Sequence, residues 1–70
     1  MKEREAIIKA KEMVRKTGKG INIIYDCDYY EANSQPRNSF FPATDHEAET
    51  FFCGCRIVGH VDTDLYATKF

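Results

Sequence analysis

Residues 2–17, KEREAIIKAKEMVRKT, and residues 20–30, GINIIYDCDYY, decide the fold between them. In the first stretch apolar side chains recur at the spacing of one helical face, at Ala6, Ile7, Ala10, Met13 and Val14. In the second stretch the period is two, with one face formed by Ile21, Ile23, Tyr25, Cys27 and Tyr29. The change of period predicts an N-terminal amphipathic helix that packs on the strand following it.

The ends of the helix also carry their expected signals. Glu3 and Glu5 fall in the first turn and Arg15 and Lys16 in the last, which complements the helix dipole. Gly18 is placed to cap the C-terminus. Ile8 is the one apolar residue off the stripe, so we expect it to face away from the core.

The middle of the chain predicts a loop followed by a short helical turn. Residues 31–43 are polar and include Pro36 and Pro42, which favours a long loop. Thr44 followed by Glu47 matches a capping box, which predicts one turn of helix there.

The remainder predicts two more strands. Residues 50–61 are strand-like, with one face formed by Phe51, Cys53, Cys55 and Ile57 and the other by Phe52, Gly54, Arg56 and Val58. Gly54 and Gly59 within them indicate a bulge or a bend. Residues 60–70 alternate again and should return as a hairpin, through Gly59 or through residues 62–64. The sequence therefore predicts a single α+β domain over residues 1–70, with one N-terminal amphipathic helix packed on a small, mostly antiparallel sheet of three or four strands.

Composition limits the class of protein. The chain has 70 residues, 43% hydrophobic and 30% charged, which is ordinary for a globular domain, although so small a domain buries only about 60% of its unfolded surface. No secretory leader or membrane-spanning run is visible, which predicts a cytoplasmic protein without a membrane partner.

The three cysteines, Cys27, Cys53 and Cys55, favour reduced thiols. We expect Cys53 and Cys55 to be buried on a strand. That reading is favoured over a zinc site built with His60, because a spacing of one residue is too short for a zinc knuckle.

Charge is divided unevenly along a chain whose net charge is −1. Residues 1–19 carry seven basic and three acidic side chains, a balance of +4, whereas residues 20–70 carry three basic and eight acidic ones, a balance of −5. This predicts a basic helix attached to an acidic remainder, without a strong nucleic-acid signal. The helix could present an anion-binding surface, but a solvated face with internal charge pairs is the favoured interpretation.

Two acidic pairs stand out as candidate metal ligands. Asp26 and Asp28 are two residues apart, as are Asp62 and Asp64, and His60 precedes the second pair. Residues two apart on a strand share a face, so neighbouring strands could gather four carboxylates for a hard cation such as Mg²⁺ or Ca²⁺. A solvated sheet face is the favoured interpretation, and no cofactor is predicted.

The polar loop supplies the candidate binding residues. Its guanidinium and amide groups could hold a phosphate or carboxylate, and neighbouring aromatic rings could stack on a base. The residues in question are Arg37, Asn38, Ser39, Phe40, Phe41 and Tyr30. An ordinary polar connection is the competing interpretation of the same loop.

These observations leave three classes of function. The first in rank is a small non-enzymatic binding or inhibitory protein that occupies a protein partner or ligand, a type frequent among viral and mobile-element proteins of this size. The second is a homo-oligomeric nucleotide-binding protein with sites shared between subunits, and the third a small metal-dependent enzyme using the aspartate pairs. Large aromatic side chains in excess of what one helix can cover predict a homo-oligomer, most simply a dimer. The competing interpretation is that these rings form the surface for a different protein, and that the chain is monomeric until this partner binds.

Overall fold

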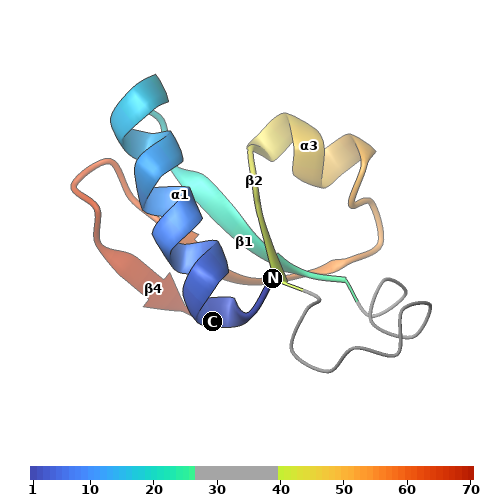
Figure 1. The fold of residues 1–70 in the computed structure, drawn as a ribbon. Coiled ribbons are helices and arrows are strands. Elements are labelled where there is room, and N and C mark those ends of the chain that lie inside the picture. Colours follow the sequence, from blue (N-terminus) through green and yellow to red (C-terminus); the bar gives the residue numbers. More distant parts are fainter. Residues whose placement is uncertain (27–39) are drawn as a thin grey trace.

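The computed structural model of the protein describes residues 1–26 and 40–70 (Figure 1). Within them the chain forms, in order, α1 (Glu3–Thr17), β1 (Ile21–Tyr25), β2 (Phe40–Ala43), α3 (Asp45–Thr50), β3 (Arg56–Val61) and β4 (Ala67–Lys69). The four strands make one antiparallel sheet in the order β2-β1-β3-β4. This confirms the predicted α+β class, with α1 packed on a four-stranded sheet.

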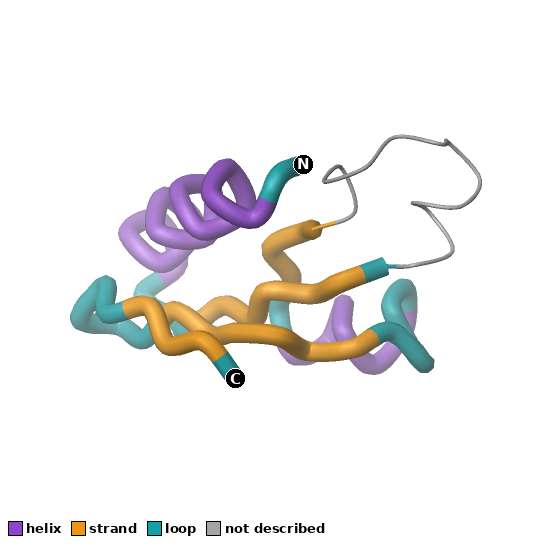
Figure 2. The backbone as a smooth tube through the Cα atoms, turned by 90° about the horizontal axis from the view of Figure 1, so that it is seen from below, coloured by secondary structure: helices purple, strands orange, loops and turns teal. Residues whose placement is uncertain are grey.

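The two helices lie on opposite faces of the sheet (Figure 2). The face under α1 holds the main core, in which α1 contributes Ala6, Ala10 and Val14 and the sheet contributes Ile21, Ile23 and Val61. Ile7 and Met13 pack beside that core, while Ile8 stays 53% exposed. Both predictions about the helical stripe are confirmed.

Local signals explain where α1 ends. Gly18 adopts a left-handed conformation, with φ of 71°, and its N–H donates to the carbonyl of Val14 at 2.8 Å. A side chain disfavours that conformation, so glycine is the residue expected at this position. The predicted cap is confirmed.

Residues 40–43 correct the predicted loop, because they form β2. Phe40 pairs with Tyr25 and Pro42 with Ile23, so both point toward the α1 face of the sheet. Phe41 pairs with Ile24 and Ala43 with Asn22, so both point toward the opposite face. Pro42 is tolerated because β2 is an edge strand, where a residue without an N–H need not break a ladder. Of the strand predicted over residues 20–30, β1 confirms Ile21–Tyr25, and Cys27, Asp28, Tyr29 and Tyr30 lie outside the described residues.

The predicted strand over residues 50–61 is wrong in its first half. The capping box at Thr44 and Glu47 is present and starts a helix that runs to Thr50. Turns follow, and Gly54 has φ of 91°, which leaves the extended region. The predicted burial of the two thiols fails with the strand, since Cys53 is exposed and Cys55 half-buried.

The second half of that segment behaves as predicted. β3 begins at Arg56, and its register with β1 slips by one residue beside Gly59, which is the expected bulge. The bulge directs both Val58 and Gly59 toward α1, so Ile57 and His60 share the opposite face. The hairpin from β3 to β4 passes through residues 62–66, one of the two predicted positions.

Candidate binding face

The sheet face opposite α1 is only half covered. Over β1 and β2, α3 and the turn after it cover Ile24 and Ala43, and the ring of Phe52 stacks on Phe41 with centroids 5.7 Å apart. Over β3 and β4 no helix of the described chain lies on this face (Figure 2).

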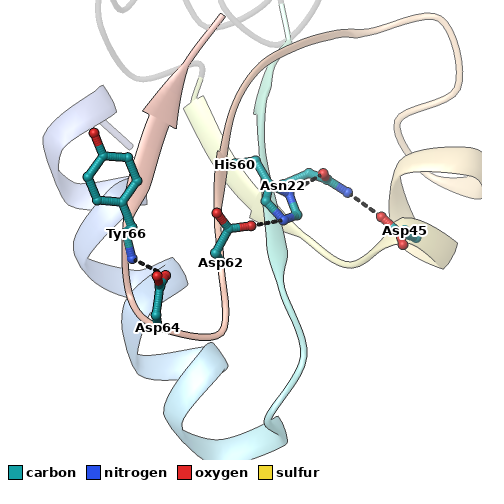
Figure 3. Close-up of polar contacts among 6 residues, drawn as sticks. All are labelled: Asn22, Asp45, His60, Asp62, Asp64 and Tyr66. Atoms are coloured by element: carbon teal, nitrogen blue, oxygen red, sulfur yellow. Dashed lines mark hydrogen bonds and ion pairs between the residues drawn. The ribbon is translucent and has the colours of Figure 1, made fainter.

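A continuous chain of polar side chains crosses the strands from the covered half to the uncovered half (Figure 3). Asn22 is 8% exposed and donates from Nδ2 to Asp45 Oδ1 at 2.7 Å. His60 Nδ1 lies 2.9 Å from Asn22 Oδ1, and His60 Nε2 lies 3.3 Å from Asp62 Oδ1. We call these four residues the polar chain. It ties α3 to β1, β3 and the hairpin turn.

The chemistry of the polar chain fixes the position of one proton. A carboxylate accepts hydrogen bonds, so the amide nitrogen of Asn22 must face Asp45, which leaves the amide oxygen facing His60. His60 Nδ1 therefore carries the hydrogen and donates it. The other ring nitrogen, Nε2, faces the carboxylate of Asp62.

Glycine at position 20 leaves room for this imidazole. A β-carbon built on Gly20 would lie 2.6 Å from His60 Nε2 and 3.3 Å from the carbonyl oxygen of Val61. The Nε2 and Cε1 edge of the ring thus lies close to the backbone at Gly20. The His60 side chain is 29% exposed.

Strand register places several large apolar side chains on the same uncovered half as His60. Ala67 pairs with the core residue Val61, so the neighbours of Ala67 along the strand point to the other face. Ile57, Tyr66 and Phe70 are 43%, 67% and 75% exposed. We call the surface formed by Ile57, His60, Tyr66, Thr68 and Phe70 the open face.

A separate cleft of about 530 Å³ lies between the end of α1 and the start of α3. Its lining residues are Thr17, Lys19, Gly20, Thr44, Asp45 and His46. Both threonine hydroxyls make hydrogen bonds within the chain. The Thr17 hydroxyl donates to the carbonyl of Met13, and the Thr44 hydroxyl accepts from the N–H of Glu47. Lys19 is the one lysine among the lining residues, and Asp45 belongs to the polar chain.

The two acidic pairs do not assemble as the metal hypothesis requires. The strands that carry them are neighbours, but they run antiparallel, so Ile21 pairs with Val61 and Tyr25 with Arg56. Asp26 and Asp62 therefore lie at opposite ends of a strand about 17 Å long. Asp28 lies outside the described residues, and within residues 1–26 and 40–70 no three His, Cys, Asp or Glu side chains are grouped to hold a metal ion.

The second pair has local structural roles instead. Asp62 is the last member of the polar chain, and Asp64 accepts a hydrogen bond from the N–H of Tyr66 at 3.0 Å (Figure 3). That bond is an Asx-type turn contact, which favours the tight connection between β3 and β4.

The predicted binding loop is largely untested. Tyr30, Arg37, Asn38 and Ser39 lie outside the described residues. Phe40 and Phe41 are half-buried on opposite faces of β2, and the ring of Phe40 lies 5.2 Å from that of Tyr25. The two phenylalanines therefore do not share one surface.

Sequence reasoning missed most of the candidate face. Asn22 stands between two isoleucines in an apolar strand, which is the one signal that could have drawn attention to it. Asp45 and Thr68 carry no such signal, because their partners are set by the register of strands far apart in the chain.

Comparison with known proteins adds no family to this description: no protein-family model matches the chain, and neither a curated protein nor a solved structure does so. In the described part of the chain, no helix has the length and apolar character needed to cross a membrane.

Proposed function

We propose that this chain is a small non-enzymatic binding protein that acts by occupying another protein through its open face. The observation that carries the proposal is the exposure of Ile57 on β3 and of Tyr66 and Phe70, which flank the short strand β4. Aromatic side chains such as tyrosine and phenylalanine are enriched in the buried centre of protein interfaces. Apolar exposure gathered on one sheet face is typical of such a surface.

The charge around the open face indicates the chemistry of the partner. Asp62 and Asp64 are exposed beside it, and residues 20–70 carry the acidic balance of the chain. A partner with an apolar patch bordered by lysine or arginine would complement both the rings and the carboxylates. The His60 and Asp62 pair offers that partner one fixed polar contact among the apolar ones.

Binding is favoured over catalysis by how the polar side chains are used. Asn22, His60 and the two aspartates of the polar chain are hydrogen-bonded or paired with one another. A catalytic group has to aim at a substrate, usually within a pocket that excludes water. The open face is instead a strand surface beside a satisfied network, which suits contact with another surface.

Two exposed isoleucines allow a matched experiment. Ile57 lies on the open face and Ile8 on the outer side of α1, and they are 43% and 53% exposed. The immobilised protein is used to capture partners from cells that express it, and each candidate is then purified and mixed with the chain. We expect a partner whose complex survives Ile8→Ser and is lost with Ile57→Ser. Reconstituted complexes that tolerate Ile57→Ser equally well would refute the proposal.

A second candidate function, sequestration of a small anionic ligand such as a nucleotide, is favoured by the cleft at Lys19. The volume of the cleft is in the range of small-molecule sites, and Lys19 supplies a cation at its wall. Titration with adenosine diphosphate, followed by amide NMR shifts, tests it. Shifts at Gly20 and Thr44 that vanish with Lys19→Ala would support this function, and shifts confined elsewhere would oppose it.

The oligomeric state is a separate proposal. We expect the chain to self-associate, because the exposed aromatic rings lie on a strand at the edge of the sheet. How two copies would meet is argued from that edge below.

A further inference from the structure

The two edges of the sheet differ in what they offer to another strand. β2 forms one edge, and its outward groups are already blocked: the N–H of Phe40 donates to the carbonyl of Met1 at 3.0 Å, and Pro42 has no N–H. An edge strand without available donors resists pairing with another chain. The β2 edge is therefore closed.

β4 forms the other edge, and its outward groups are intact. Toward β3, the carbonyl of Tyr66 accepts from Asp62 and the N–H of Phe70 donates to Val58. Hydrogen-bonded positions alternate along an antiparallel strand, so Thr68 also faces β3 while Ala67 and Lys69 direct their N–H and C=O groups away from it. No further strand of the described chain lies beyond β4. The β4 edge is open.

We propose that two copies of this chain form a dimer by pairing β4 with β4, antiparallel, about a two-fold axis at Thr68. Ala67 then lies opposite the partner's Lys69, and each of these pairs exchanges two backbone hydrogen bonds. The pairing satisfies the outward donors and acceptors of both strands and extends the sheet to eight strands.

The side chains fit the same register. Tyr66 and Phe70 are two positions either side of Thr68 on the open face, so each Tyr66 lies opposite the partner's Phe70. Both rings are more than 60% exposed in the single chain, at 67% and 75%, and aromatic pairs across neighbouring strands attract. On the α1 face, Lys69 of one copy lies opposite Ala67 of the other. Its ammonium stays 2.9 Å from Glu3 of its own chain. No like charges are brought together across the strands.

The neighbouring register is disfavoured by the backbone. A two-fold axis at Ala67 would require Leu65 to continue the strand opposite the partner's Lys69. Leu65 has φ of 67°, a left-handed conformation that interrupts a strand. The turn thus leaves Thr68 as the centre of the available edge.

The dimer would also join the two open faces into one continuous surface across the axis. This consequence rests on the proposed binding function, whereas the strand pairing itself does not. The two are separable, because Ile57 lies on β3, away from the pairing edge.

The decisive test removes the outward hydrogen bond at Ala67. Light scattering across a dilution series should give twice the 8.1 kDa of one chain at high concentration, and Ala67→Pro should reduce the mass to one chain while circular dichroism stays native. The matched control Ile57→Ser should keep the dimer and lose only the partner. A monomer at every concentration, or a dimer that persists in folded Ala67→Pro, would overturn the proposal.

Two further variants keep the test decisive if Ala67→Pro does not fold. Tyr66→Ser combined with Phe70→Ser changes exposed side chains only, and should weaken the dimer at least tenfold. Thr68→Cys, in a background with Cys27, Cys53 and Cys55 changed to Ser, should cross-link under mild oxidation, because the two residues at the axis face each other. Lys69→Cys in the same background should not. Equal cross-linking of the two variants would exclude this register.

Discussion

The hydrogen bond between Asn22 and Asp45 should contribute measurably to stability, and its size can be worked from the structure. Asn22→Ala removes a donor to a carboxylate, worth about 1.5–3 kcal/mol, and an acceptor for His60, worth about 1 kcal/mol. Asp45 is exposed and regains water when the bond is lost, which lowers the total. We expect Asn22→Ala to reduce the free energy of unfolding by about 2 kcal/mol.

For a domain of this size 1 kcal/mol corresponds to roughly 4–8 °C in melting temperature, so the expected loss is about 8–16 °C. Urea unfolding of Asn22→Ala, Asp45→Ala and the double variant isolates the pair. The effect of Asp45 on the α3 dipole appears in both backgrounds and cancels in the cycle. A coupling energy of about 1 kcal/mol is expected, and strict additivity of the two changes would refute the reasoning.

Exchanging the two side chains provides a further control. Asn22→Asp alone places a carboxylate oxygen where Nδ2 now lies, 2.7 Å from Asp45 Oδ1, so two acceptors repel. Asp45→Asn added to it restores a donor and an acceptor at that contact, while His60 still donates to position 22. The double exchange should therefore be more stable than Asn22→Asp alone.

Three other changes follow from the glycines and the exposed thiol. Gly20→Ala should lower stability by about 1–2 kcal/mol because its β-carbon displaces the His60 ring, and the loss should be smaller in a His60→Ala background, where only the 3.3 Å approach to the Val61 carbonyl oxygen remains; thermal melts of the four proteins measure it. Gly59→Ala should cost more, about 2–3 kcal/mol, because the new β-carbon would lie 2.9 Å from the backbone oxygen of Thr68, and a melt equal to wild type would contradict the bulge geometry. Cys53→Ser should change urea stability by less than about 0.5 kcal/mol, since Cys53 is exposed; a large loss would restore the buried-thiol prediction.

Sequence patterns predicted the elements whose signals are local. The α1 stripe, the Gly18 cap and the capping box at Thr44 depend on residues within a turn or two of one another, so their physics can be recognised without tertiary structure. β1 was recognisable for the same reason, because Ile21, Ile23 and Tyr25 stand at every second position of a short segment rich in β-branched residues.

The error at residues 50–55 shows the limit of period-two patterns. Phe51, Cys53 and Cys55 stand at every second position, as on one face of a strand, yet the capping box at Thr44 starts a helix that runs to Thr50 and Gly54 turns the chain. The residue pattern of a helix end followed by a turn can thus resemble the period-two pattern of a single strand. The nearby Phe52 packs on Phe41 across the sheet face, a contact that no local spacing encodes.

The candidate face depended on register, which is why it was predicted only in part. His60 and Asp62 were noted from the sequence, but as metal ligands together with Asp26. The antiparallel pairing of β1 and β3 separates Asp26 from Asp62 and brings Asn22 beside His60 instead. The direction in which β1 and β3 pair therefore decides which residues of the two strands become neighbours.

The strand order also constrains how the chain can fold as it is synthesised. β1 lies between β2 and β3, so it has two partners, and one of them begins only at Arg56. Until that residue is available, the edge of β1 that will meet β3 stays unpaired beside Ile21, Ile23 and Ile24. An unpaired strand rich in β-branched residues is prone to aggregate. Slowing translation between β2 and β3 should accordingly lower the yield of native protein more than slowing it within α1.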